Sequence, residues 1–541
     1  MSMRTSIIGG DSAHRGLFGG RISKARLWAV GSSIALTLVL VFIIGLWALA
    51  IGVVLIGLAW FATIDTANNT ILQRRMKAAR WKERNKRGTT KFVPYDQDGW
   101  DMLTDRWAEA ATREEKRDSM QELHAMRDTP DGVTGMLWLQ DGVGEPGIQW
   151  HQTPEGEEYL AVTFATTGQV TGIETDQVFD VASAGFSTVL ASLGDPLGFA
   201  KRIQSISRDM PTDSAQHEAW MAEHGDPSVP AKLLHSYKDV IDGVAAGQLM
   251  QRPMFTVSWP VTDRFVNRAA RFGDAALGWR LFMANEIEGM RRLLVGAGFE
   301  NVHALSARQT AAVIRHMQHP GFPIDQVADV TPTSGWLPSE DAWSYTTYVG
   351  APKGGQVSVS LSRTARVTAK NLEVIERNAL WMAPLLGGMQ QQVVRTIAWH
   401  IEGSPQDEAR HLAEQDRVSD TADQIKRRKD GQLEDVALDV EADAAARRHM
   451  DLKPGTGHAG ANWVGYITIT DGTERGLADV SELLEDAASR AGIRKLEWLE
   501  VDSATANAFT WPVGRGIAPA NVSIGSKVEQ FAQGKEAKEA L

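Results

Sequence analysis

The sequence of 541 residues contains no cysteine. Structural disulfides and thiolate chemistry are therefore excluded, and a structural zinc site is not expected. The signatures of three common enzyme classes are also missing. The segment at Gly350 reads GAPKGGQV and lacks the Lys-Ser/Thr pair of a phosphate loop, no GxGxxG fingerprint follows a predicted strand, and GFSTV at Gly185 lacks the second glycine of a nucleophile elbow.

Histidines are too sparse to predict a metal centre. His316 and His319 are three residues apart on a predicted helix, but no carboxylate or third histidine lies near them in the sequence. His400 follows Trp399 in a predicted strand, where we expect a buried structural residue. We therefore predict no catalytic residue, no cofactor and no metal, and interpret the chain as a non-enzyme. An active site assembled from residues far apart in the chain stays open as an alternative.

The most unusual feature that is present is a run without charge from Leu27 to Ile64. About 20 apolar residues span the roughly 30 Å hydrocarbon core of a bilayer, so this run is too long for one crossing and barely long enough for two. It predicts a transmembrane helical hairpin over residues 27–64 with its turn at residues 44–46. The alternatives are a cleaved signal peptide, whose apolar region would be about 7 to 15 residues, and a buried hairpin in the core.

Both flanks of this run are basic. Upstream lie Arg15, Arg21, Lys24 and Arg26, and downstream lie Arg74, Arg75, Lys77, Arg80, Lys82, Arg84, Lys86 and Arg87. Because short basic flanks stay on the cytoplasmic side, the pattern predicts a multi-pass protein of the plasma membrane with both termini cytoplasmic. The eight downstream residues are our predicted contacts with lipid headgroups. Two other roles stay open for them: fixing the topology only, or contacting nucleic acid.

The rest of the chain alternates predicted strands and helices. EEYLAVTFATTG, KRIQSISRD, RPMFTVSWPV, VVRTIAWHI and WVGYITIT predict strands, with Phe255, Val257 and Trp259 on one face of the third. Ser306 and Gln309 have the spacing of a capping box, and residues 266–295 predict one long helix. TFATTG and YITITDG occupy equivalent places in two similar units. The expected fold class is thus a membrane-anchored α+β protein: a transmembrane helical hairpin followed by two α+β lobes with helix-covered sheets.

These patterns divide the chain into segments. We expect a cytoplasmic N-terminal segment (1–26), the transmembrane hairpin (27–64), a basic juxtamembrane helix (65–91), a first lobe (92–320), a linker (321–341), a second lobe (342–520) and a flexible tail (521–541). Within the second lobe, residues 404–450 predict a charged helical excursion that is poor in apolar residues.

Several stretches together resemble a known family. LWMAPLLGGMQQQVVRTIAWHIEGSP, WVGYITIT and EWLEVDSATANAFTWPVGRGI, with the double apolar run and its basic exit helix, are similar to membrane proteins of actinobacterial conjugative elements. These have PrgI-type membrane helices before a region like the N-terminal half of type IV secretion ATPases, without the ATPase domain. YTTYVGAPKGG departs from the family pattern because it lacks a tryptophan–proline step.

The resemblance implies a non-catalytic membrane scaffold of a conjugative DNA-transfer or type IV-like secretion apparatus. Such a scaffold would dock a separate ATPase, and we expect it to be a homo-oligomer because closed symmetry is the usual way to assemble identical lobes. The alternative is a core membrane component of an actinobacterial type VII secretion system. No catalytic residue is carried over from the family, because the segment that hydrolyses ATP has no counterpart here.

Overall fold

The structure is a computed structural model that describes most of the chain between residues 24 and 517. The described residues are 6–8, 24–45, 47–62, 65–66, 69–154, 156–170, 174–211, 220–221, 223–226, 228–245, 249–353, 355–373, 375–387, 389, 393–411, 414, 450 and 459–517. Most of the predicted charged excursion and the predicted tail therefore lie outside the described residues.

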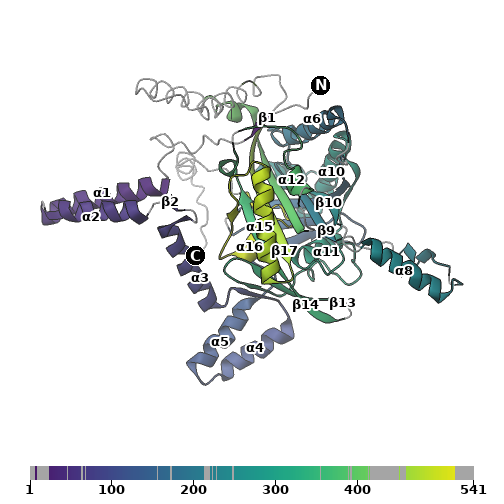
Figure 1. Cartoon of the computed structure of the whole chain (residues 1–541), viewed down its shortest axis with the longest axis horizontal. Helices are drawn as coiled ribbons and strands as arrows, with labels where there is room; N and C mark the ends of the chain where they lie inside the picture. The colour runs from purple at the N-terminus through teal and green to yellow at the C-terminus, as the bar shows by residue number, and fades with distance from the viewer. Residues whose placement is uncertain are drawn as a thin grey trace.

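Within the described residues, one mixed sheet of 14 strands runs through the body (Figure 1). In spatial order its main path is β5 (Met126–Arg127), β4 (Lys91–Pro94), β12 (Ser339–Asp341), β13 (Thr346–Lys353), β14 (Gln356–Val367), β17 (Gly460–Asp471), β16 (Val394–Ser404), β9 (Arg202–Pro211), β10 (Leu249–Pro260), β8 (Glu158–Thr167), β7 (Ile148–Gln152) and β6 (Met136–Gln140). Strand β11 (Glu300–Ala304) pairs with β8, and β18 (Glu497–Trp498) pairs with β14. Short pairs lie outside this sheet: β1 (Ser6–Ile8) with β15 (Ile375–Arg377), and β2 (Asp65–Thr66) with β3 (Asn69–Thr70).

The two predicted lobes share this sheet because β9 and β16 pair with each other. Their antiparallel register joins eight residue pairs, from Arg395 opposite Asp209 to Glu402 opposite Arg202. On either side of this junction the strand order is mirrored: β9, β10 and β8 in one direction, and β16, β17 and β14 in the other. Strand β17 therefore corresponds to β10, so the predicted equivalence of TFATTG in β8 with YITITDG in β17 is wrong.

Helices cover both faces of the sheet. On one face, the first unit packs α6 (Asp176–Leu193), α9 (Asp263–Ala269) and α10 (Ala275–Gly296), and the second unit packs α12 (Ala383–Leu386) and α15 (Glu474–Arg490). The opposite face is covered by α11 (Ala307–Gln318) and α16 (Ser503–Ala508), and a single-turn helix, η2 (Ala369–Asn371), follows β14. The predicted alternation of Phe255, Val257 and Trp259 is confirmed, because all three are buried in one hydrophobic cluster.

Local signals at helix ends had mixed success. The capping box of Ser306 and Gln309 is confirmed at the start of α11, with both reciprocal hydrogen bonds formed. The single helix predicted over residues 266–295 is wrong, because α9 ends at Ala269 and α10 begins only at Ala275. Gly273 has a positive φ of 157° in the break, a conformation that glycine adopts without steric cost.

Several helices project from the sheet (Figure 1). They are the pair α1 (Lys24–Ile44) and α2 (Trp47–Ala62), the pair α4 (Gln97–Glu109) and α5 (Arg113–Ala125), and the single helix α8 (Ala231–Ala245); α3 (Ile71–Arg87) lies between the first pair and the body. Each projecting pair is held together mainly by its own two helices.

The predicted transmembrane hairpin is wrong. The apolar run does form two adjacent helices, α1 and α2, which are joined at Gly45, but α2 has 16 residues and is only about 24 Å long at about 1.5 Å per residue. Helix α1 includes the charged Lys24 and Arg26 in its first turn. Among the residues that the structure describes, no helix has both the length and the apolar character needed to cross a bilayer. The expected membrane-anchored class and multi-pass plasma-membrane location are thus contradicted, and the chain has an α+β fold with a large mixed sheet.

An ion pair lies buried at the junction of the two units. The Arg395 Nη2 atom is 2.5 Å from Asp209 Oδ2, and both side chains are at most 5% exposed. Arg395 also donates to the carbonyl of Leu386 at 2.6 Å. Burial raises the pKa of Asp209 to about 6, while the neighbouring Arg395 and Arg208 act in the opposite direction. Substitution of either Arg395 or Asp209 alone would therefore leave a buried charge without its partner at this junction.

Breaking this pair from one side should destabilise the fold. We expect Arg395→Met to lower the free energy of unfolding by about 3 kcal/mol at pH 8, because Asp209 is left buried without its cation. The loss should be smaller at pH 5, where Asp209 takes up a proton. The double variant Asp209→Asn/Arg395→Met should recover part of the loss in denaturant unfolding, because the unpaired buried carboxylate is removed while Arg208 also loses its neighbouring charge. Equal stability of Arg395→Met and the wild type at pH 8 would contradict this account.

Candidate interaction surfaces

Arg84 makes the most contacts of any α3 side chain with the body. Arg84 Nη1 lies 2.9 Å from Asp341 Oδ2 and 3.0 Å from Asp502 Oδ1, and its Nη2 lies 3.0 Å from Asp131 Oδ2. The same guanidinium donates to the carbonyls of Thr89 and Val501. Arg84 thereby ties α3 to three separate segments of the body, and its side chain is only 12% exposed.

The carboxylate of Asp341 is the most buried partner of Arg84. It is 1% exposed, and its Oδ1 accepts hydrogen bonds from the Thr346 hydroxyl at 2.7 Å and the Ala504 backbone N–H at 2.8 Å. Burial raises the pKa of Asp341 to about 6, against the opposing effects of Arg84 and these two donors. Since the folded-state pKa lies above the usual value for Asp, this group favours the folded state less as pH rises from about 4 through 6.

The structure divides the eight basic residues that the sequence singled out. Lys77 pairs with Glu500 at 3.1 Å and Arg80 with Asp502 at 3.0 Å, so with Arg84 they form the docking face of α3, where Trp81 also meets Trp343 edge to face. Arg80 nevertheless remains 68% exposed. The other five are exposed as well: Arg74, Arg75, Lys82, Lys86 and Arg87, of which Arg87 pairs with Glu83 on the same helix. Contact of the eight with lipid headgroups stays a prediction.

A second constellation lies where the C-terminal part of the described chain crosses the sheet. We call residues 509–516 the strap. Gln204 in β9 holds the strap from both of its amide atoms: Nε2 donates to the Trp511 carbonyl at 2.8 Å, and Oε1 accepts from the Gly514 N–H at 2.9 Å. Gly514 has a positive φ of 67°, and a Cβ there would lie 2.5 Å from the Ser258 hydroxyl. The strap therefore needs glycine at this position.

Polar side chains from both units complete the hold on the strap. Gln149 donates to the Pro512 carbonyl at 2.8 Å, and Tyr159 donates to that of Val513 at 3.0 Å. From the second unit, His400 Nε2 donates to the Phe509 carbonyl at 2.7 Å, Tyr466 donates to that of Gly516 at 2.6 Å, and Thr468 and Thr510 share a hydrogen bond of 3.0 Å. These buried polar groups bind the strap, so the strap links the two units across their junction.

The three histidines considered from the sequence, His316, His319 and His400, are engaged in structural contacts. His316 Nδ1 donates to the Phe322 carbonyl at 2.7 Å, and His319 contacts the Ser358 hydroxyl at 3.0 Å. Burial lowers the pKa of His316 to about 3 and that of His400 to about 4. In the part of the chain that the structure describes, no three acidic or histidine side chains are grouped as metal ligands would be.

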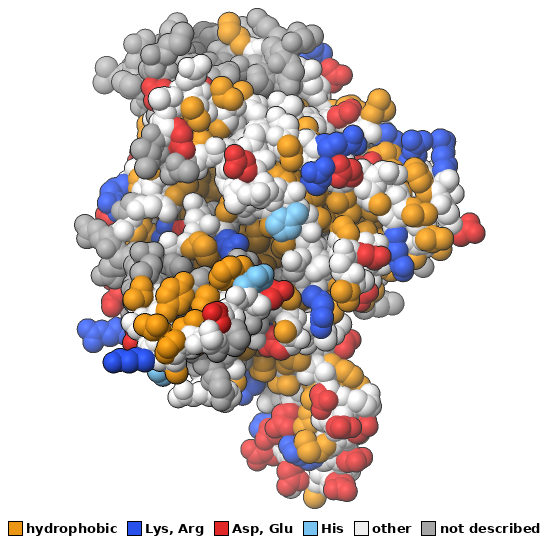
Figure 2. Space-filling view, turned by 90° about the vertical axis from the view of Figure 1, so that its right-hand side faces the viewer, with side chains coloured by type: hydrophobic (Ala, Val, Ile, Leu, Met, Phe, Trp, Pro, Cys, Tyr) orange, Lys and Arg blue, Asp and Glu red, His pale blue; other side chains and the backbone are white. Residues whose placement is uncertain are grey.

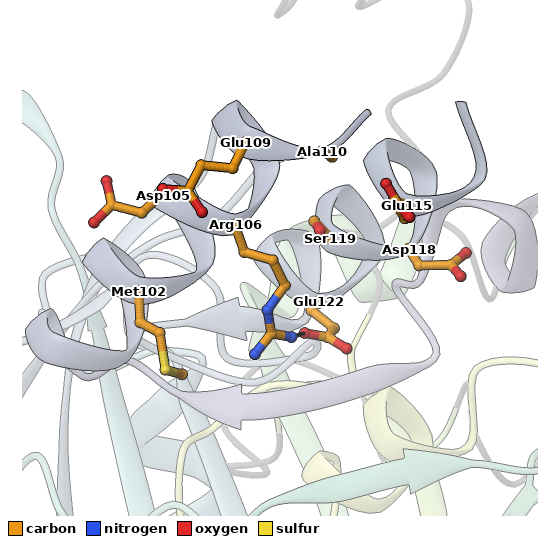
Figure 3. A pocket seen from close by; sticks show the side chains of 9 residues that line it. All are labelled: Met102, Asp105, Arg106, Glu109, Ala110, Glu115, Asp118, Ser119 and Glu122. Carbon is orange, nitrogen blue, oxygen red and sulfur yellow. Dashed lines mark hydrogen bonds and ion pairs between the residues drawn. The ribbon is translucent and has the colours of Figure 1, made fainter. Parts of the chain in front are cut away.

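A groove lies between the projecting helices α4 and α5, with a volume of about 800 Å³ (Figure 3). Its lining is mainly acidic: Met102, Asp105, Arg106, Glu109, Ala110, Glu115, Asp118, Ser119 and Glu122. The two helices carry four acidic residues each, against one and three basic residues. Arg106 bridges to Glu122 across the groove at 2.9 Å, Asp118 pairs with Arg117 at 3.1 Å, and Glu115 caps the start of α5. Within the described residues, Asp105 and Glu109 have no ion pair. This surface can bind a basic partner.

The known proteins give no independent guide to function. No protein-family model and no curated protein sequence matches this chain.

Sequence reasoning missed three features of these surfaces. Helix α8 was not predicted, although the spacing of Leu233, Tyr237 and Val240 is a helical signal. The roles of Arg84 and of the strap were also missed, because their partners lie hundreds of residues away in the sequence. No pattern within a short stretch of the sequence predicts such contacts.

The docking of α3 should depend on Arg84. We expect Arg84→Met to cost about 3 kcal/mol in the free energy of unfolding, because three carboxylates lose their common cation. Limited proteolysis should then cut residues 71–91 earlier than in the wild type. The matched variant Arg87→Met removes an exposed charge and should change stability by less than about 0.5 kcal/mol. Identical proteolysis of Arg84→Met and the wild type would show that α3 is held by other contacts.

Binding of the strap should weaken in acid through His400. Because burial holds the pKa of His400 at about 4 in the folded protein, below its ordinary 6.5, the unfolded chain binds the extra proton first. The stability that neutral His400 provides is present above pH 6.5 and is lost as pH falls towards 4. In urea unfolding, the advantage of the wild type over His400→Gln should therefore shrink over this range. An advantage that does not vary with pH would refute the assignment.

Proposed function

We propose that this chain is a non-catalytic scaffold of a conjugative DNA-transfer or type IV-like secretion apparatus, which docks a separate ATPase and assembles as a homo-oligomer. The observation that carries the proposal is that the buried polar side chains bind the chain's own backbone, while exposed side chains gather on projecting helices. The buried polar side chains around the strap bind its backbone, whereas the exposed helical surfaces project away from the body.

The acidic pair α4–α5 is the surface that we assign to the ATPase. Its red side chains gather on the knob at the bottom of Figure 2, well away from the rest of the body. Local contacts stabilise the pair: α5 begins with a complete capping box at Thr112 and Glu115, and Leu103 and Leu123 are buried. A preformed acidic groove would speed the encounter with a basic surface and select against acidic ones.

Helix α8 supports the assembly of several copies. All residues from Ala231 to Val240 are exposed, including Leu233 at 61% and Val240 at 58%. A helix with an uncovered apolar stripe usually packs against another protein surface. The helices α1 and α2 also expose large apolar side chains, among them Phe42 at 92% and Trp47 at 80%.

The resemblance to conjugative-element proteins supports the choice of apparatus. The stretches that carry it form structural parts: WVGYITIT lies in β17, VVRTIAWHI contributes β16, and FTWPVGRG is the strap. These are the strands and the segment at the centre of the fold, where the two units meet.

Docking should be measurable with the purified chain and a purified conjugation ATPase. We expect Asp105→Lys/Asp118→Lys to weaken the complex about tenfold or more at low salt, because two of the carboxylates that line the groove are replaced by cations. The control Asp479→Lys/Glu482→Lys makes the same change of net charge on the exposed face of α15 and should bind as the wild type does.

Two results would count against the proposal. One is equal binding by both charge-reversal variants, which would move the docking site elsewhere or remove it. The other is hydrolysis of ATP by the purified chain alone, which would favour the enzyme alternative.

A further inference from the structure

A second groove opens beside α9, on the opposite side of the first unit from the strap. It has a volume of about 560 Å³ and is lined by Phe199, Arg264, Asn267, Arg268 and Arg271. The three arginines follow each other at intervals of four and three residues, about one helical turn each, so they form a row about 10 Å long on one side of α9 and the turn after it.

The row is held in place by the core beneath it. Phe265 and Ala269, on the other side of α9, are fully buried, and the Thr262 hydroxyl caps the helix by accepting from the Phe265 N–H at 3.2 Å. Arg264 lies over the Phe199 ring at 4.5 Å and donates to the carbonyl of Pro196 at 2.8 Å. The first guanidinium is thereby fixed at one end of the groove.

These three arginines differ from most others in the molecule. Arg84, Arg202, Arg252, Arg315, Arg366 and Arg395 all pair with carboxylates. Within the described residues, no carboxylate is paired with Arg264, Arg268 or Arg271, and all three side chains are exposed. Burial raises the pKa of Glu286, while Arg268 and Arg264 act in the opposite direction. Glu286 is partly buried and accepts a hydrogen bond from Trp259 at 3.2 Å. Arg268 and Arg271 therefore present positive charge without a carboxylate partner in the described part of the chain. At the end of the row, Arg264 and Lys201 donate to the backbone carbonyls of residues 195–197.

We infer that this groove binds the phosphodiester backbone of a nucleic acid strand. Guanidinium groups bind phosphate through paired N–H donors, and a row about 10 Å long can contact more than one phosphate of a strand. The whole chain has a formal charge of −11, so attraction to a polyanion has to come from a local cationic surface rather than from net charge. This inference deepens the DNA-transfer part of the proposed function and rests on it, but it does not involve the ATPase.

The test is the binding of a fluorescently labelled single-stranded oligonucleotide to the purified full-length chain. We expect Arg268→Gln/Arg271→Gln to bind about tenfold more weakly than the wild type. Its plot of log affinity against log salt should also be shallower by about 1.4, since each lost contact with a single strand contributes about 0.7. The matched control is Arg291→Gln/Arg292→Gln on α10, whose charges are engaged by Glu288. It should bind as the wild type does.

Each other result decides against the inference. Equal binding and equal salt dependence in the two double variants would place any nucleic acid contact elsewhere. Tighter binding to polyglutamate than to the oligonucleotide, lost in Arg268→Gln/Arg271→Gln, would assign the groove to an acidic protein partner. Competition by inorganic phosphate at the affinity of the oligonucleotide would mean a single-phosphate site. Thermal melting of both variants tests whether they are folded. If the wild-type chain docks the ATPase but does not bind the oligonucleotide, this inference fails while the proposed function stands.

Discussion

The antiparallel pairing of β9 with β16 is the constraint on which the rest of the body depends. It joins the sheets of the two units into one, so the position of every outer strand depends on this central pair of strands. The junction also places polar side chains at the middle of the sheet, where water is excluded and each unpaired group would cost free energy. The strap provides partners for these polar groups. Its backbone carbonyls and one N–H group form hydrogen bonds with Gln204 in β9 and with His400 in β16, one on each side of the junction. Removing the strap would leave those groups buried without partners.

The sequence predicted the parts of this body whose signals are local. The strands around the junction and the capping box at Ser306 follow from alternation and from spacing over three residues, and both are properties of a short window. The pairing of β9 with β16 joins residues nearly 200 positions apart, and the contacts of Arg84 with Val501 span more than 400. Such contacts depend on the whole topology. The same limit explains why the break between α9 and α10 was missed, since one glycine interrupts an otherwise continuous helical pattern.

The apolar run shows how a composition signal can mislead. Its length and basic flanks predict a membrane hairpin, and the charges of the second flank predict contacts with lipid headgroups. In the structure, Lys77, Arg80 and Arg84 instead turn towards carboxylates of the body. A cation that is satisfied by Asp341 or Glu500 contributes less to the attraction of an external anionic surface than an exposed one does. Charge counting in a sequence cannot distinguish these two cases, because the acidic partners are supplied by segments far away in the chain.

Charge is separated on this molecule by element rather than spread evenly. Acidic side chains dominate the α4–α5 knob, whereas the row on α9 is cationic, and the two surfaces belong to different parts of the fold. Such separation has a cost in self-repulsion within each surface, and the core does not need it, since the folded body is held by apolar clusters and by the strap. Evenly mixed charges would keep the chain equally soluble. The two proposed partners, a basic surface and a polyanion, would each meet a surface of opposite charge on a different helical element of this fold.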